Sequence, residues 1–284
     1  MVRSRHGLSC PIVVADAFDV EALDKMCQDA EVILSTAGPY HKYGSDLVRS
    51  CVNAGCHYVD ITGESFWIRD QIEKHHKDAE AKGVRIINAC GFDSAPSDLG
   101  VFYAVNKVVG EVESVHCFQA WKGESSGGTM ETMFSSVDAK LTKGGLGKFS
   151  LNPENTVSVH QKKMTNDKIK IKKIPHIGGW TGPFIMALPN TRVVRRSAAL
   201  SKKIGKYYGE NFVYSEGAYH SNKGAARKVS IMTLVLGLMI FSPLRKFLRP
   251  FFRKPGEGPS QEAMDSGFFK SRFLVKTQDG VQAF

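Results

Sequence analysis

The sequence has no cysteine or histidine pattern with the spacing of a metal site. Its cysteines lie apart, and most fall within predicted helices or strands: Cys10, Cys27, Cys51, Cys56, Cys90 and Cys117. Unpaired cysteines in such positions are typical of reduced, buried thiols in an intracellular protein. The sequence therefore predicts no bound metal.

The sequence also lacks an apolar N-terminal segment and has relatively few acidic residues. Residues 1–10 are basic and too short to carry the apolar core of a secretory signal. The chain has 28 acidic residues against 38 basic ones, a net charge of +10. This excess favours an anionic partner: a nucleic acid, a membrane surface or a phosphorylated cofactor. Because no basic-aromatic recognition motif is present, we expect no nucleic-acid partner.

The first part of the chain alternates between short β-branched runs and helix-like segments. Strands are predicted over 12–15, 32–36, 58–61 and 84–89, and helices over 20–28, 45–54, 64–81 and 97–108. Such alternation is typical of a parallel sheet in an α/β fold, in which ligands bind beyond the carboxyl ends of the strands. At 284 residues the chain is long enough for one large or two smaller domains.

The second part begins with an alternating run over 112–120 that predicts a half-buried strand. A small-residue turn at 125–129 then precedes a predicted helix over 130–139. Backbone N–H groups at the start of that helix could bind an anion, or Thr129 could simply cap the helix. A further strand is predicted over 272–276.

One late segment differs from the rest of the chain. Residues 229–241 are almost continuously apolar, and residues 244–254 alternate apolar with basic side chains. The apolar run is shorter than the roughly 20 residues of a membrane-spanning helix. A buried helix followed by a solvated basic face remains an alternative, but the exposed aromatic residues favour contact with an anionic membrane over 229–254.

Four blocks carry a resemblance to a known family: Gly38–Tyr40, Cys51–Asp60, Gly63–Glu64 and Cys90–Gly100. Their order and spacing resemble the saccharopine dehydrogenase-like oxidoreductases, a family that includes the trans-acting enoyl reductases. The resemblance implies an NAD(P)-binding Rossmann-type domain over residues 1–110. It implies a second α+β domain with mainly antiparallel strands over residues 111–284, for substrate binding or dimerisation.

The sequence also departs from the family pattern. Family members open with a strand, a glycine-rich turn and a helix, whose backbone N–H groups approach the cofactor pyrophosphate. No strand or glycine cluster precedes Ile12. We therefore expect an incomplete Rossmann-type sheet that begins inside the nucleotide domain, and a second domain shorter than in the family.

The resemblance places cofactor-binding candidates at the predicted strand ends: Thr36, Ala37, Gly38, Pro39, Tyr40, Asp60, Gly91, Phe92, Asp93 and Ser94. Tyr40 could stack on a ring or pack inside the protein. Asp60 could bind ribose hydroxyls or cap a helix, and capping is favoured for Asp16 and Glu64. Cys90 is more plausible as a packed thiol than as a nucleophile, because no base is assigned to it. No catalytic residue is assigned.

Two functions from different classes are predicted. The first is an NAD(P)-dependent oxidoreductase acting on a lipid-related or other small-molecule substrate at a membrane or lipid surface. The second is a non-catalytic membrane- or lipid-associated protein whose truncated Rossmann core no longer binds cofactor. Both readings imply an intracellular protein at a lipid droplet, mitochondrion or similar surface, and the resemblance allows a homo-oligomer.

Overall fold

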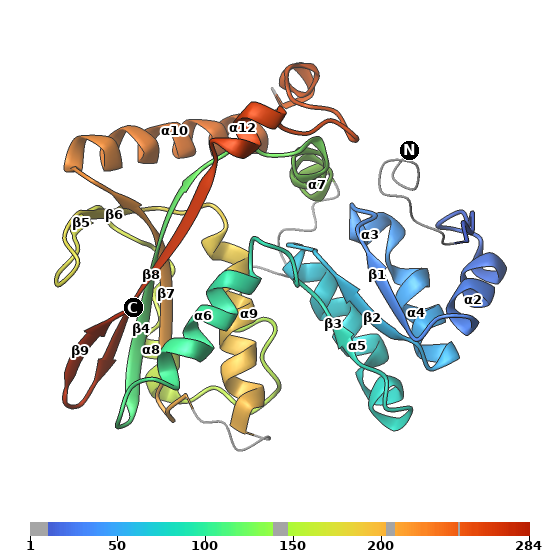
Figure 1. Ribbon diagram of the computed structural model, residues 1–284, viewed down its shortest axis with the longest axis horizontal. Helices are drawn as coiled ribbons and strands as arrows, with labels where there is room; N and C mark the ends of the chain where they lie inside the picture. Colours follow the sequence, from blue (N-terminus) through green and yellow to red (C-terminus); the bar gives the residue numbers. More distant parts are fainter. Residues whose placement is uncertain (1–10, 139–146, 203–207, 244) are drawn as a thin grey trace.

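The computed structural model describes residues 11–138, 147–202, 208–243 and 245–284, arranged around two separate β-sheets (Figure 1). The first sheet is three-stranded and parallel, in the order β1-β2-β3. Its strands are β1 (Val32–Ser35), β2 (His57–Asp60) and β3 (Ile86–Ile87), and its helices are α2 (Val20–Gln28), α3 (Tyr40–Tyr43), α4 (Ser45–Ala54) and α5 (Ser65–Ala81).

Local signals explain where these helices begin and end. The Asp19 side chain accepts a hydrogen bond from the backbone N–H of Ala22 and so caps α2, as predicted. The Asp16 carboxylate accepts from the N–H of Phe18, which makes the predicted turn before that helix. Gly55 ends α4 in the left-handed conformation, with φ of 78°.

The predicted strand over residues 12–15 is absent. Ile12, Val13 and Val14 are 69%, 65% and 90% exposed, and the segment is extended coil. A strand needs a neighbour that accepts its backbone hydrogen bonds, and this segment pairs with no strand among the described residues. The neighbouring β1 is thus the edge of the sheet, with Leu34 68% exposed.

The second sheet is six-stranded, in the order β5-β6-β7-β4-β8-β9. Its strands are β4 (Val112–Lys122), β5 (Lys172–Lys173), β6 (Trp180–Gly182), β7 (Val213–His220), β8 (Phe268–Thr277) and β9 (Gly280–Ala283). Only the β4–β7 pair is parallel, and the other pairs are antiparallel. The α/β fold class is confirmed: a three-stranded parallel sheet is followed by a second sheet in which all described pairs except β4–β7 are antiparallel.

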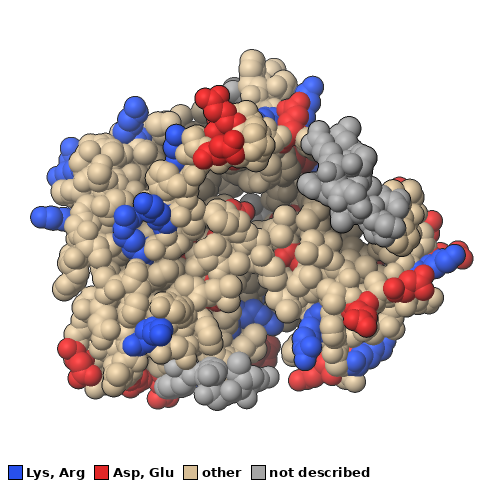
Figure 2. Space-filling view, in the orientation of Figure 1, with Lys and Arg blue, Asp and Glu red and all other residues tan. Residues whose placement is uncertain are grey.

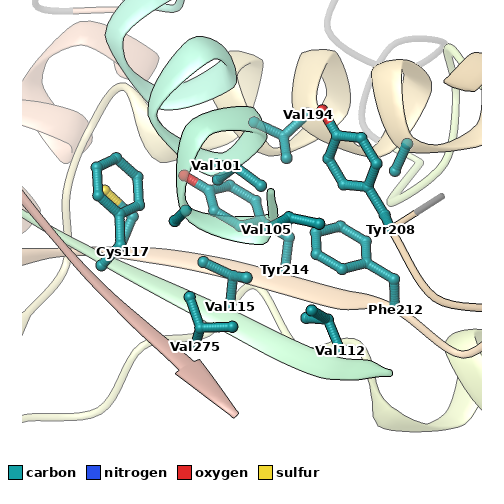
Figure 3. Packing of buried hydrophobic residues seen from close by; sticks show 13 residues of the cluster. Val101, Val105, Val112, Val115, Cys117, Val194, Tyr208, Phe212, Tyr214 and Val275 are labelled. Atoms are coloured by element: carbon teal, nitrogen blue, oxygen red, sulfur yellow. The ribbon is translucent and has the colours of Figure 1, made fainter. Parts of the chain in front are cut away.

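Helices α6 (Ala95–Val105) and α9 (Ala187–Ser201) cover one face of the second sheet. Their apolar side chains meet those of β4, β7 and β8 in the largest buried cluster (Figure 3), which includes Val101, Val115, Val194, Tyr214 and Val275. Helix α6 begins two residues earlier than the predicted range, with Pro96 in its first turn, where its missing N–H is not needed.

Helix α7 (Gly127–Asp138) begins before the predicted cap. The Ser126 hydroxyl, and not Thr129, accepts the hydrogen bond at its start, from the backbone N–H of Thr129 at 3.3 Å. The Gly127 N–H donates to the Glu257 carbonyl. A Cβ at Gly127 would lie 1.7 Å from the Lys254 carbonyl oxygen. The start of α7 is therefore packed against the segment at 253–257, which leaves little room for an anion.

Helix α10 (Lys223–Phe241) extends the predicted apolar run at its N-terminal end and crosses the top of the second sheet in Figure 1. It is long and apolar enough to cross a membrane by length and composition alone. The remaining elements are α8 (Val159–Met164), α11 (Arg245–Leu248), the 3-10 turn η3 (Arg249–Phe251) and α12 (Gln261–Asp265).

Candidate cofactor crevice

The carboxyl ends of the three parallel strands lie side by side. Ser35 of β1 pairs with Asp60 of β2, and the Cys90 N–H donates to the Asp60 carbonyl at 2.8 Å. The turns that follow the strands, at 36–38, 61–64 and 90–93, therefore form one edge of the sheet. This edge faces a hollow beneath α10 and α12, visible near the centre of Figure 2.

Asp60 stabilises this edge of the sheet from inside the protein. Its side chain is fully buried and accepts hydrogen bonds from the backbone N–H groups of Thr62 and Ala89 and from the Asn88 amide. Burial raises the pKa of its carboxyl, although these three donors oppose the rise. The structure therefore places Asp60 in a bracing position between β2 and β3, away from the open surface.

Glu64 caps a helix other than the one it precedes. Its carboxylate accepts from the backbone N–H groups of Tyr40 and His41 at the start of α3, at 2.7 and 3.0 Å, and it contacts His41 Nδ1 at 2.6 Å. No side-chain cap from Glu64 is present at the start of α5. Glu64 therefore caps a helix, as predicted, but the capped helix is α3 and not the following helix α5.

Tyr40 lies inside the protein, in the packed position that the sequence left open. Its side chain is 4% exposed, its hydroxyl donates to the Ser35 carbonyl at 3.0 Å, and its ring packs on Trp67. Pro39 is also buried. Tyr40 therefore shapes the turn, and its ring does not reach the hollow.

The exposed part of the first turn consists of Thr36, Ala37 and Gly38. A Cβ at Gly38 would lie 3.6 Å from Thr132 Oγ1 of α7, an ordinary van der Waals distance, so α7 lies directly beside this turn. Glu131 of α7 contacts Lys42 at 3.8 Å across the same gap. A glycine here permits the close approach of a ligand to the backbone.

The third turn joins the two sheets. A Cβ at Gly91 would lie 2.9 Å from Ile61 Cβ, so the adjacent turns touch and glycine is required. Phe92 is 65% exposed, and its ring meets the edge of Phe269 of β8 at 4.6 Å. Ser94 is buried and donates to Asn190 Oδ1 of α9 at 2.8 Å.

Asp93 has the side chain best placed for proton transfer in this turn. It is exposed to solvent, yet the surrounding protein raises the pKa of its carboxyl. A carboxyl group that contacts solvent and is also partly surrounded by protein atoms is typical of a concave surface. Burial of this kind favours the protonated form of the carboxyl more than in an ordinary aspartate.

Cys90 is exposed, not packed as predicted, and its thiol donates to the Ile87 carbonyl. Partial burial, Asp60 and Asp98 together raise its pKa. The thiol therefore stays protonated at neutral pH, which argues against a nucleophilic role, as predicted.

Behind Ser94 lies a buried polar network that the sequence did not reveal. The Glu216 carboxylate of β7 accepts from Asn190, Gln119, Ser97 and Tyr214. Glu216 is 1% exposed, and burial raises its pKa against the effect of these four donors. The network joins α6, α9, β4 and β7 directly behind the third turn. Its members are distant in sequence, so no local pattern could have indicated it.

The crevice fits part of a dinucleotide. The open backbone at Thr36–Gly38 and Gly91–Asp93 suits the flat nicotinamide ring and its ribose. A diphosphate needs free N–H groups or cations. The α3 N–H groups are bound by Glu64, and those at the start of α6 are bound by the carbonyls of Gly91 and Ser94. The residues described at this edge thus offer no diphosphate site.

No group of three or more histidine, cysteine, aspartate or glutamate side chains is placed to hold a metal ion in the described part of the chain.

Comparison with known proteins defines the class. Residues 1–87 match the model of the saccharopine dehydrogenase NADP-binding domain. The chain is 34% identical over 294 residues to a trans-acting enoyl reductase homologue of Mycobacterium tuberculosis, covering 96% of this chain and 69% of that protein. It is 34% identical over 302 residues to the trans-acting enoyl reductase of Mycobacterium ulcerans, covering 96% and 70%. Apo saccharopine dehydrogenase from Saccharomyces cerevisiae aligns with 12% identity and a TM-score of 0.44, covering 99% and 75%.

The family model and the two mycobacterial relatives define an NADP-binding oxidoreductase class. The chain belongs to the saccharopine dehydrogenase-like family that includes the trans-acting enoyl reductases. The family predicted from the blocks between Gly38 and Gly100 is confirmed.

Proposed function

We propose that this protein is an NAD(P)H-dependent oxidoreductase that acts on a lipid-related substrate at an anionic membrane or lipid-droplet surface. The single observation that carries the proposal is an exposed apolar face on α10, the helix that crosses the top of the second sheet (Figure 1). Family membership supplies the reaction class, and α10 supplies the argument for the surface.

The apolar side chains of α10 point away from the protein. Ile231, Leu234, Val235, Leu238 and Phe241, here called the α10 stripe, are 62%, 63%, 48%, 64% and 63% exposed. Their spacing of three and four residues places them on one helix face. Apolar patches of this kind on a soluble surface mark a protein or membrane contact.

The opposite face of α10 is anchored to the protein. Ala226 is fully buried, and the Ser230 hydroxyl lies 3.1 Å from the position of a Cβ on Gly182 of β6. Ile240 is 2% exposed and packs with Met130 and Phe134 of α7. A helix attached near both ends lies along a surface more readily than it crosses a bilayer, so we propose in-plane binding.

Basic and aromatic side chains flank the stripe. Arg227 and Lys228 precede it, and Lys246 follows it, all exposed. Phe247 and Phe251 are 77% and 86% exposed. Each basic residue near an anionic headgroup contributes about 1 kcal/mol to binding, which favours an anionic lipid surface as the partner.

When bound, the nicotinamide would supply or accept the hydride. The turns at Thr36–Gly38 and Gly91–Asp93 would position its ring at the carboxyl ends of the first sheet. Asp93 would hold the proton that accompanies reduction of a carbon–carbon or carbon–nitrogen double bond. Phe92 and Phe269 would give the substrate side an apolar wall.

Nucleotide titration tests the enzyme part. We expect NADPH or NADH at millimolar concentration to raise the midpoint of thermal unfolding. A Gly38→Val variant, which adds bulk between this turn and Thr132, should reduce that shift. A Gly237→Val variant on α10, where an added Cβ meets no heavy atom within 4 Å, provides the control. No nucleotide effect on the wild-type protein would refute cofactor binding.

Vesicle flotation tests the surface part. We expect the protein to float with phosphatidylserine-containing vesicles and not with pure phosphatidylcholine vesicles. A variant with Leu234→Ser and Leu238→Ser should stay in the soluble fraction. The matched control, Val13→Ser and Val14→Ser, removes exposed apolar groups from the first unit and should float like the wild type. Equal flotation of both variants would contradict the role of the α10 stripe.

A non-catalytic, lipid-associated protein is the second candidate. The occupied N–H groups of α3 and α6, which leave no diphosphate site at the described strand ends, favour this alternative. Flotation without any nucleotide effect would support it over the oxidoreductase.

A further inference from the structure

A second cavity lies along the free edge of β3, between α5 and α9. Its volume is about 460 Å³, within the range of small-molecule sites. Among the described strands β3 pairs with β2 alone, and Ile86, Ile87 and Asn88 of its free side line this space. None of the three turns at 36–38, 61–64 and 90–93 is among the described residues that line it. The cavity is therefore separate from the cofactor crevice.

Most of its wall is apolar. Helix α5 contributes Ile68 and Ile72, the β3 region contributes Ile86 and Ile87, and Leu200 of α9 closes the far side. A wall of this composition stabilises an alkyl chain at about 25 cal/mol for each Å² removed from water.

Two arginines, Arg85 and Arg196, line this wall together with the carboxylates of Glu80 and Asp98, and Arg196 is the more enclosed arginine. The Arg196 guanidinium donates from Nη1 to the Leu151 carbonyl at 2.6 Å, and no carboxylate lies within ion-pair distance of it in the described structure. Burial lowers its pKa. An enclosed cation with unused donors favours the binding of an anion, and a planar guanidinium suits a carboxylate in particular.

Two buried side-chain oxygens in the same wall also accept no hydrogen bond from the described residues. Gln71 is 2% exposed and its Oε1 has no hydrogen-bond partner among the described residues, because its Nε2 is directed to Asp70 and Ser45. Asp98 Oδ2 accepts from Ser197, whereas Asp98 Oδ1 has no donor in the described part of the chain. A buried acceptor without a donor costs about 1–3 kcal/mol, which a ligand hydroxyl would recover.

We propose that this cavity binds a hydroxy acid with a medium-length alkyl chain. The ligand carboxylate pairs with Arg196, its hydroxyl donates to Asp98 Oδ1 or Gln71 Oε1, and its chain lies against the isoleucine and leucine side chains. The site is independent of the proposed oxidoreductase function, since it needs neither nucleotide nor a membrane.

Calorimetric titration of the full chain with 3-hydroxyoctanoate tests the site. We expect saturable binding, weaker binding of octanoate, which lacks the hydroxyl, and very weak binding of octan-1-ol, which lacks the carboxylate. Arg196→Gln should weaken 3-hydroxyoctanoate binding by about tenfold or more, the usual effect of losing a charge-assisted pair. Arg69→Gln, an exposed arginine of α5 paired with Glu73, should leave it unchanged.

Further variants separate specific binding from misfolding and from adsorption to α10. Arg196→Lys keeps the charge and should restore part of the affinity, and Asp98→Asn should reduce the advantage of the hydroxy acid over octanoate. The α10 stripe variant Leu234→Ser with Leu238→Ser should bind like the wild type. Equal affinity of the wild type and Arg196→Gln, or binding of octan-1-ol as tight as that of 3-hydroxyoctanoate, would overturn the proposal.

Discussion

The Glu64 carboxylate lies 2.7 Å from the backbone nitrogen of Tyr40, which joins the end of β2 to the start of α3. A helix start is a natural place for an anion because its first N–H groups are free. Here the protein supplies that anion itself. A cofactor phosphate is therefore excluded from this point, although the neighbouring turn at Thr36–Gly38 remains open.

Glu64→Ala should destabilise the protein by about 2 kcal/mol, since it removes the acceptor of two buried N–H groups and a contact with His41. Urea unfolding followed by circular dichroism measures the change. Glu73→Ala removes only the exposed pair with Arg69 and should cost less than about 0.5 kcal/mol. Equal losses in the two variants would show that the Glu64 contacts contribute little.

Gly100→Ala should destabilise the second unit by about 1–3 kcal/mol, because the new Cβ would lie 2.2 Å from Cζ of Phe273 on β8. Phe273→Leu should remove much of the clash, so the two changes should couple in a double-mutant cycle. Gly237→Ala on α10 is the control. Its Cβ meets no heavy atom within 4 Å, so a small gain in stability is expected. Additive losses at Gly100 and Phe273 would contradict the close contact.

Asp98 should make stability fall as pH rises. Burial raises the pKa of its carboxyl, so the folded state binds a proton that the unfolded state has already released. The loss begins near the ordinary aspartate pKa, about 4, and is complete above the raised value. Asp98→Asn should therefore raise the thermal midpoint more at about pH 8 than at about pH 4. A uniform shift across this range would argue against the raised pKa.

Asp93→Asn should lower kcat for reduction by about a hundredfold if Asp93 holds the transferred proton, while KM for the nucleotide changes little. This prediction depends on the proposed oxidoreductase function. The high-pH limb of the wild-type kcat profile should disappear in the variant, which a purely structural role would not produce. Asp265→Asn, on exposed α12, is the control. An unchanged pH profile in Asp93→Asn would remove Asp93 from proton transfer.

Much of the first sheet could be predicted because its signals are local. The helices over 20–28, 45–54 and 64–81 have capping residues and apolar faces that the sequence displays directly, and the structure reproduces them closely. The prediction of a strand at 12–15 was wrong for a non-local reason. The β-branched residues there favour a strand, but no described strand accepts the backbone hydrogen bonds of this segment. Strand β3 covers only Ile86–Ile87 of the predicted 84–89, and among the described strands it pairs with β2 alone.

The candidate site was predicted as a region but not in its contacts. Glycine and acidic residues at strand ends identified the edge of the sheet. The partner of each side chain depends on contacts between distant segments, such as Glu64 with Tyr40, Ser94 with Asn190, and Glu216 with its four donors. The cavity beside Arg196 was missed entirely, because its walls come from helices that lie far apart in the chain.

The attachment of α10 near both of its ends has a kinetic consequence. A helix tethered at only one end lets the protein body tumble freely above a bilayer. Because Ala226 and Ile240 are both packed against the body, surface-bound molecules would all share one tilt. The crevice beneath α10 would then stay at a constant height above the lipid, and a lipid-dissolved substrate would reach it by two-dimensional diffusion.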